Sequence, residues 1–284
     1  MVTSSPRSNG SPAATQAISH AATLCVVLLG AQIRSQLQYR ASFVLQALAQ
    51  STATLVDFIA TVLLFQRFPT LAGWSLGEVA FLCGLGGVAF AVSDLACGGF
   101  DRLSIAIQTG AFDRVLTRPV GAFLQTLTSD FQIRRVGRIA QAALVFAVSL
   151  TWVQIDWTPL KLVVLLSAVV SGVAIFGAIW VIGAATTFWT VQTSEVTNVF
   201  TYGGSEMVSR PMPIYADWLR RFFTFVVPLA FVAYLPALYV LGRPDPLGLP
   251  WALQLCSPLV AAVFFLPAYA AWSLGVRHYQ STGS

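Results

Sequence analysis

Apolar residues gather in six long stretches that are separated by shorter polar segments. The stretches are approximately 42–65, 76–96, 139–153, 160–186, 222–241 and 251–276. An α-helix rises about 1.5 Å per residue, so roughly 20 apolar residues cross the ~30 Å hydrocarbon core of a bilayer. The third stretch is short, and we expect Arg138 and Trp152 at its ends to extend it into the interface. The pattern predicts an all-α, polytopic membrane protein with six transmembrane helices.

The composition supports this fold class. Hydrophobic residues make up 56% of the chain and charged residues only 10%, whereas a soluble domain carries about 25% charged residues. So few charges cannot cover a globular surface in water, and we expect the outer surface to face lipid. The two histidines lie near opposite ends of the chain, and no CxxC pair occurs among the four cysteines. We therefore expect the cysteines to be small buried side chains and predict no metal site.

Basic residues indicate the orientation of the predicted helices. With both termini in the cytoplasm, 13 of the 16 Lys and Arg residues lie on the cytoplasmic side, six of them between the second and third helices. The others are Arg67, Lys161 and Arg243. Because cytoplasmic loops are enriched in Lys and Arg, the sequence predicts an N-in/C-in topology. The net charge of +5 follows from this topology, so we predict the lipid bilayer and no nucleic acid as a partner.

The N-terminal region carries two further segments. Residues 1–20 are rich in Ser, Pro, Thr, Ala and Asn, which predicts a disordered tail before a six-span domain at 21–284. The apolar run at 21–33 has two interpretations, an amphipathic helix at the cytoplasmic interface or the core of a signal peptide. We prefer the interfacial helix, because only Arg7 precedes the run and no clear cleavage site follows it.

Two predicted cytoplasmic segments are too long to be simple turns. Residues 97–138 contain apolar positions at helical spacing on both sides of Gly110, and Arg118-Pro119 ends the second of these pieces. Residues 187–221 contain a Gly-Gly pair and a Pro-Met-Pro run, followed by an aromatic and basic approach to the fifth predicted helix. Both segments indicate short interfacial helices that are joined by helix breakers.

Catalytic motifs are missing from the sequence. A phosphate-binding loop GxxxxGK[ST] needs a lysine that reaches the nucleotide phosphates, and the single lysine, Lys161, lies in TPLKL. A zinc protease needs HExxH or similar ligands, and neither histidine falls within a predicted span. We therefore predict that the chain is not an enzyme on its own and holds no cofactor itself.

Ionisable residues inside predicted spans are costly and mark functional candidates. Asp57 falls near the middle of the first predicted span, and two interpretations are open: it faces a polar pathway, or it pairs between helices. Asp94, like Glu78, lies towards an end of the second span, where pairing or solvation is favoured. The spans contain no chain of acids of the kind that relays protons, which argues against an ion-coupled carrier.

Four stretches resemble the permeases of type-2 ATP-binding-cassette (ABC) exporters, in particular a six-span bacterial branch. With the span layout they cover nearly all of the chain beyond residue 20. They are Tyr39-Arg40 with Ser42-Phe43, the run I-x-x-G-x-x-D-x-x-L-x-R-P from Ile107 to Pro119, the segment PIYADWLRRFFTFVVPLAFVAYLPALYVLG at 213–242, and W-x-x-G-x-R-x-Y-Q-S-T-G-S from Trp272 to Ser284.

The resemblance implies an exporter in the bacterial plasma membrane. Two permeases, identical or paralogous, would each join a cytoplasmic ABC ATPase subunit that binds ATP and Mg. In this family the loop between the second and third spans bears the coupling helix that docks on the ATPase, which corresponds here to about 98–119. The implied coupling residues are Gly110, Phe112, Asp113, Arg114, Leu116, Arg118 and Pro119.

The residues alone leave other functions open. A charged, amphipathic, broken-helix loop is a suitable docking surface, but its arginines could equally serve topology alone. The alternatives to a permease are a membrane assembly or sensor subunit that transports nothing, and an ion-coupled carrier. An ATPase gene beside this one would distinguish the permease from these alternatives.

Overall fold

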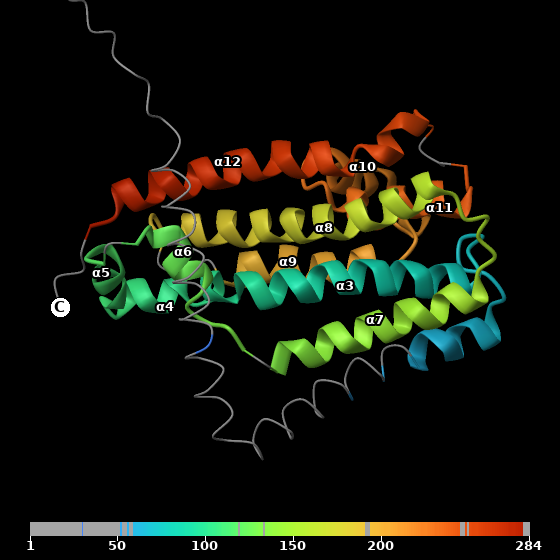
Figure 1. Cartoon of the computed structure of the whole chain (residues 1–284), viewed down its shortest axis with the longest axis horizontal. Helices are drawn as coiled ribbons and strands as arrows, with labels where there is room; N and C mark the ends of the chain where they lie inside the picture. Colours follow the sequence, from blue (N-terminus) through green and yellow to red (C-terminus); the bar gives the residue numbers. More distant parts are fainter. Residues whose placement is uncertain are drawn as a thin grey trace, which may run out of the picture.

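Figure 1 shows a computed structural model of the chain. The structure describes residues 30, 52, 56, 59–118, 120–132, 134–190, 194–244, 248 and 250–280. The predicted tail at 1–20 lies outside these residues, as do nearly all of the predicted interfacial helix and most of the first predicted span. Residues 59–65 of that span are described, and they belong to a helix that ends at residue 67. The described residues form helices and turns with one isolated bridge between Leu71 and Trp74. The all-α prediction is therefore confirmed for this part of the chain.

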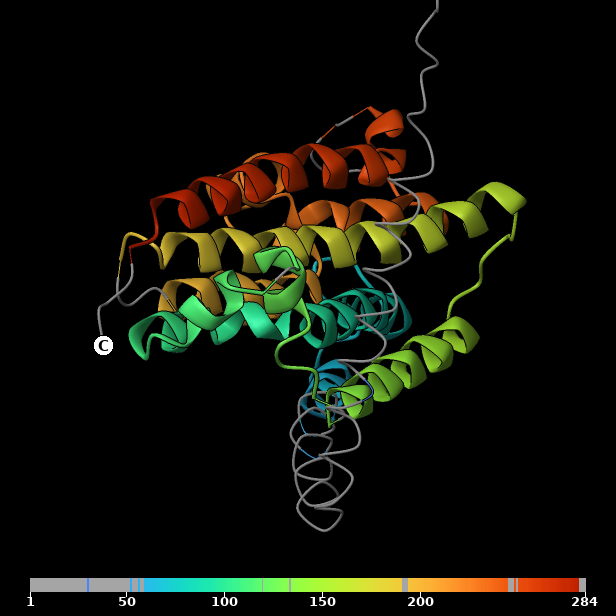
Figure 2. The ribbon, with the colours of Figure 1, turned by 60° about the vertical axis from the view of Figure 1, so that its left-hand side comes forward.

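The helices follow one another along the chain without sheet structure between them. They are α3 (Leu76–Asp101), α4 (Leu103–Gln108), α5 (Ala111–Leu116), α6 (Ala122–Leu127), α7 (Arg134–Trp152), α8 (Pro159–Thr186), α9 (Ser194–Val208), α10 (Asp217–Phe225), α11 (Tyr234–Leu241) and α12 (Ser257–His278). Short 3-10 turns lie at η1 (Met212–Ile214), η2 (Leu229–Phe231) and η3 (Trp251–Leu255). Helices α3, α7, α8 and α12 lie side by side along the bundle, with α4, α5, α6 and the last turn of α12 gathered at one end (Figures 1 and 2).

Helix α3 is the centre of the bundle. It begins at Ser75, whose hydroxyl accepts a hydrogen bond from the Glu78 amide while the Glu78 carboxylate accepts one from the Ser75 amide at 2.8 Å. Its partner α7 runs antiparallel to it and packs closely on it. Gly84 permits this close approach, because a Cβ at that position would collide with the Phe146 backbone. On the other side, Gly172 of α8 allows a similarly close approach. Small residues at helix contacts are how membrane helices maximise van der Waals packing.

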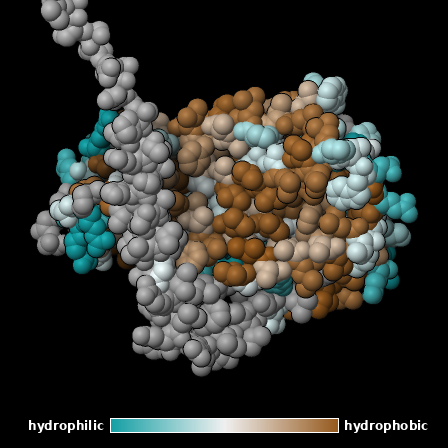
Figure 3. All heavy atoms as spheres, in the orientation of Figure 1, coloured by the Kyte–Doolittle hydropathy of each residue, from teal (hydrophilic) through white to brown (hydrophobic). Residues whose placement is uncertain are grey.

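Three helices among the described residues are long and apolar enough to cross a membrane. They are Leu76–Gln108, in which α4 continues α3, together with Pro159–Thr186 and Ser257–His278. They correspond to the second, fourth and sixth predicted spans, although the first of them runs well beyond residue 96. Helix α7 covers the third predicted span but starts earlier, at Arg134. The exposed surface between the two polar ends is largely apolar (Figure 3), which is the surface of a membrane protein.

The fifth predicted span, 222–241, is not one straight helix. Helices α10 and α11 meet at 74°, because Pro228 has no N–H to continue α10 and its ψ of 50° turns the chain away. Val232 of the break packs on Gly172, halfway along α8, while Arg243 beyond α11 donates to the Gly73 carbonyl at the start of α3 at 2.7 Å. The bend lies mid-bundle and the far end of α11 lies near the start of α3, so this segment is a bent helix pair, either a broken span or a re-entrant loop.

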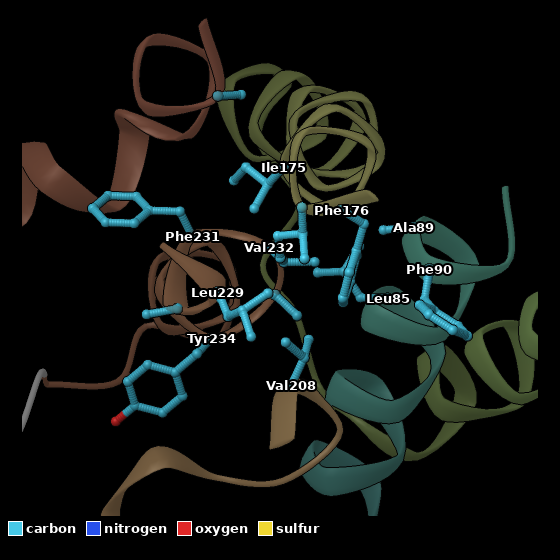
Figure 4. Packing of buried hydrophobic residues seen from close by; sticks show 14 of the residues in the cluster. Leu85, Ala89, Phe90, Ile175, Phe176, Val208, Leu229, Phe231, Val232 and Tyr234 are labelled. Atoms are coloured by element: carbon cyan, nitrogen blue, oxygen red, sulfur yellow. The ribbon is translucent and has the colours of Figure 1, made fainter. Parts of the chain in front are cut away.

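The break at Pro228 is tolerated because protein surrounds it. Leu229 and Val232 are buried against α9 and α8 (Figure 4), Phe231 is buried on the other side of the break, and the Ser257 hydroxyl donates to the freed Phe231 carbonyl at 2.8 Å. Broken backbone occurs at membrane depth only where protein or enclosed water satisfies it. The break therefore follows from its neighbours as much as from Pro228.

The middle part of the predicted loop at 187–221 forms helix α9, which packs along the bundle. Thr197 of α9 lies against Gly183 near the end of α8, whereas Val208 lies against Gly86 of α3. The Cys83 thiol donates to the Ser209 carbonyl at 3.1 Å. Helix α9 therefore runs back along α3 and α8, away from the end that holds α4–α6. It carries Arg210 and all of α10 away from that end.

Candidate functional site

The segment between α3 and α7 folds into short helices at one end of the bundle. Helix α4 continues the direction of α3, so the predicted start of the coupling segment at residue 98 falls inside a long helix. The separate part begins at Gly110, whose φ of +67° is readily adopted by glycine and ends α4 before α5 starts. Gln125 of α6 then donates to the Val115 and Val120 carbonyls at 2.9 and 2.6 Å, which fixes α6 to α5.

An aromatic cluster fastens these short helices to the bundle. Its members come from α3, α5, α6, the turn after α8, α12 and the residue after α12, and they are Phe100, Phe112, Phe123, Phe188, Trp272 and Tyr279. Trp272 is central, with ring centroids 5.2 Å from Phe100, 5.5 Å from Phe188 and 5.7 Å from Phe123. The near-perpendicular arrangements favour aromatic attraction, worth about 0.5–1.5 kcal/mol per pair beyond the area that is buried.

A hydrogen bond extends the aromatic cluster to a charged group. The Tyr279 hydroxyl donates to the Asp113 carboxylate at 2.9 Å. Burial, and then the hydrogen bond to Asp113 and its negative charge, raise the pKa of Tyr279 above its ordinary value of 10. The hydroxyl therefore keeps its proton, and remains a donor, throughout the neutral range.

A charge network lies beside the aromatic cluster. It consists of Asp94 on α3, Arg102 after α3, Asp130 after α6, and Arg135 and Arg138 on α7. Asp94 is 1% exposed, with Arg138 at 2.6 Å and Arg135 at 3.4 Å. Arg135 also reaches Asp130 at 3.6 Å, and Arg102 reaches Asp130 at 3.1 Å. The network thus ties α3 and α7 to the connection that follows α6.

The bundle is shaped to hold this network. A Cβ on Gly98 would collide with the Arg135 guanidinium, so the glycine leaves the space that the arginine fills. Arg135 also donates to the Asp94 backbone carbonyl at 2.5 Å. Nearby, Trp180 of α8 donates its indole N–H to the Asp101 carboxylate at 2.8 Å. Buried charges need such partners, because an unpaired charge costs several kcal/mol away from water.

The structure separates the predicted coupling residues into two groups. Leu116 is 42% exposed, and Arg114 and Arg118 are exposed beside it. Phe112, in contrast, is 0% exposed within the aromatic cluster, and Asp113 bonds to Tyr279. Phe112 packs on Phe188 and Tyr279, whereas Leu116 lies at the end of α5 on the surface, and the coupling roles of both residues stay predictions.

The remaining predicted site residues have different outcomes. Asp94 pairs between helices, so the interhelical interpretation describes it in this structure. Pro119 and Asp57 lie outside the described residues, and both interpretations of Asp57 stay predictions. In the described part of the chain no three His, Cys, Asp or Glu side chains are grouped as metal ligands.

Sequence reasoning missed several residues of this site. Arg135 was interpreted only as a topology signal and Arg138 as a topology signal and an interfacial flank, although their spacing of three places both on one helix face. Trp272 and Tyr279 stood in the terminal motif without a role. Their partners lie far away along the chain, so no local pattern could have paired them.

The fold and this site define a helical membrane protein whose long helices are fastened at one end to a group of short ones. A profile of the family described as ABC-2 family transporter protein matches residues 52–283. The chain therefore belongs to the ABC-2 transporter family. No curated protein and no solved structure is significantly similar to it.

Proposed function

We propose that the chain is the transmembrane permease subunit of an ABC exporter, driven by a separate cytoplasmic ATPase that binds ATP and Mg. Membership of the ABC-2 family supports this proposal, since its membrane proteins are typically permeases without catalytic activity. The observation that carries it is the firm attachment of α4, α5 and α6 to the long helices. A docked ATPase that displaced these short helices would thereby move the spans.

A revised six-span topology supports the same function. The spans are the region around 42–67, then α3, α7, α8, α9 and α12, with α10 and α11 as a re-entrant pair. Helix α9 replaces the segment 222–241, and the even count keeps both termini in the cytoplasm. Arg210, Arg220 and Arg221 then leave the cytoplasmic side, so ten basic residues lie inside and six outside. The positive-inside rule still favours N-in/C-in, with α4–α6 in the cytoplasm.

The ATPase would dock on the exposed side of α4 and α5. Ile105 is 59% exposed and Leu116 is 42% exposed, and exposed arginines surround them at 102, 114 and 118. This surface fits a groove with an apolar floor and an acidic rim, because apolar burial provides affinity and opposite charges orient the partners. Phe112 would support the surface from behind rather than contact the ATPase.

The substrate pathway would follow the exposed face of α9 and α10. Glu206, Asp217 and Arg221 are exposed there, and Glu206 lies between Gly204, which packs near Phe176 of α8, and Val208. Glu206 lies within one turn of Val208, which packs on Gly86 of α3, and charged side chains at such a depth face a bundle interior or water rather than lipid. A water-filled path between this chain and a second permease, identical or paralogous, would accommodate them.

Docking is tested by affinity purification of the chain with the ATPase subunit from its native membrane. Truncating Ile105 and Leu116 together to alanine removes two half-exposed side chains from the proposed docking surface. Full burial of one such side chain is worth about 1.5–3 kcal/mol, and ~1.4 kcal/mol changes a dissociation constant tenfold. We therefore expect the ATPase to bind at least tenfold more weakly. Val136→Ala is the matched control, because Val136 is 44% exposed at the same end but lies on α7. Undiminished ATPase recovery with the double variant would disprove the docking surface. ATP hydrolysis by the pure chain would disprove the proposal that a separate subunit hydrolyses ATP.

A further inference from the structure

Helix α5 is attached to the bundle through few of its own residues. It is six residues long, and Phe112 is its one buried residue. Isolated helices of this length are unstable in water, so contacts with other elements decide where α5 lies. The contacts of Phe112 and Asp113 are therefore more important than the intrinsic stability of the helix.

Tyr279 contacts both of these residues at once. Helix α12 ends at His278, and Tyr279 has extended backbone with φ −59° and ψ 129°. Its ring lies edge-on to Phe112 with centroids 5.1 Å apart, and its hydroxyl donates to Asp113 at 2.9 Å. One side chain thus joins the end of α12 to two successive residues of α5, once by packing and once by a charge-assisted hydrogen bond.

The end of α12 is itself held at a second point. His278 stacks on Trp189 with ring centroids 5.8 Å apart and planes 22° apart. One turn earlier, the Phe188 ring occupies the space over Gly275, where a Cβ would collide with it. The last turn of α12, the turn after α8, and α5 consequently form one packed unit.

We propose that Tyr279 is a positioning residue that makes α12 move together with α5 when the ATPase binds nucleotide. The inference rests on the proposed function, and it adds a second connection to the one that the chain makes through α4 and α3. Helix α12 suits this role, because only 22% of its apolar window is buried, against 67% for α3 and 56% for α8. Of these three helices, α12 is the least enclosed by the rest of the chain.

The Tyr279 hydroxyl can be removed without removing its ring. In Tyr279→Phe the packing on Phe112 stays, while the hydrogen bond to a charged group is lost, which shifts an attached–detached equilibrium by roughly 10- to 100-fold. Asp113→Ala removes the other partner, and the two changes together complete a double-mutant cycle. Tyr269→Phe is the control, since the Tyr269 ring packs on Phe123 of the same cluster at 5.4 Å.

The experiment measures the distance between spin labels on α5 and α12 in the complex with the native ATPase. Labels replace Thr117, which directly follows α5, and Leu274 of α12, which are both exposed. Spectra are recorded without nucleotide and after trapping with ATP and vanadate. We expect one unchanged distance in the unsubstituted chain and in Tyr269→Phe. In Tyr279→Phe, Asp113→Ala and the double variant, trapping should add a second population to the same extent. ATPase binding and thermal stability should stay near those of the unsubstituted chain.

The outcomes separate the two proposals. If the ATPase binds and trapping changes the complex, but Tyr279→Phe gives the same distances as the unsubstituted chain, the coupling role of Tyr279 is disproved and the permease function stands. If the substitutions at 113 and 279 have additive effects, the hydrogen bond is not the connection and the inference is equally overturned. If no ATPase binds the unsubstituted chain, the proposed function itself fails.

Discussion

Removing Asp94 should destabilise the bundle more than any other single change of charge in the described residues. In Asp94→Ala the Arg135 and Arg138 side chains, which are 11% and 20% exposed, keep their charge and lose their shared carboxylate. Breaking a buried ion pair by removing one partner costs about 3–5 kcal/mol. The Asp130 carboxylate compensates Arg135 in part, so we expect a value near the lower end, about 3 kcal/mol.

A loss of this size is measurable in detergent. One kcal/mol lowers the Tm of a chain of 150–250 residues by roughly 2–4 °C, so the expected decrease is about 10 °C. Cys97 is buried one turn from Asp94, and a thiol-reactive dye that becomes fluorescent on labelling would report the unfolding. Glu78→Ala is the control: its ion pair with Arg243 at 3.1 Å is more exposed, and we expect a decrease of at most a few degrees.

Replacing both partners should restore stability. Asp94→Leu with Arg138→Met exchanges the ion pair for apolar side chains, and such exchanges are often neutral or stabilising. We expect the double variant to unfold at a higher temperature than either single variant. Equal Tm values for Asp94→Ala and the unsubstituted chain would refute the reasoning, because they would mean that the two guanidinium groups reach water or another anion without cost.

Three further predictions follow from the same region. Phe112→Ala should lower the free energy of unfolding by about 3–5 kcal/mol, as for other buried aromatic residues, whereas Leu116→Ala should lower it by less than about 1 kcal/mol. The dye assay compares the two variants, and equal losses would contradict the buried position of Phe112. Gly98→Val should destabilise by displacing Arg135, and adding Arg135→Ala should recover part of the loss; no recovery would place the cause elsewhere. Because the pKa of Tyr279 is raised, the stability difference between the chain and Tyr279→Phe should be full below pH 10 and shrink as the pH rises above that value; a difference that persists at higher pH would contradict the hydrogen bond to Asp113.

The three candidate spans, Leu76–Gln108, Pro159–Thr186 and Ser257–His278, were predictable to within their ends because hydropathy and helix length are local properties. Any run of about 20 apolar residues satisfies its own backbone by forming a helix in lipid. The resemblance to the ABC-2 permeases was likewise readable from motifs, and the family match confirms it. Neither property depends on how the helices are arranged in space.

The conformation of segment 222–241, in contrast, is not determined by local hydropathy. It is as apolar as a span, and prolines are common in membrane helices, so composition favoured one crossing. Whether Pro228 kinks a helix or ends it depends on whether neighbours satisfy the freed carbonyls. Ser257, 26 residues beyond Phe231, does so here, and this partner is invisible to any local pattern.

The candidate site divides in the same way between sequence and tertiary structure. The sequence by itself determined the membrane fold class, a breaker at Gly110 and an amphipathic segment around it, because these follow from neighbouring residues. Only the tertiary structure decided that Phe112 faces α12 while Leu116 faces outward, and that Arg135 and Arg138 meet Asp94 more than 40 residues away. An apolar side chain gains the same free energy against its own bundle as against a partner, and an arginine can serve topology or an ion pair, so the choice depends on which surfaces the fold brings within reach.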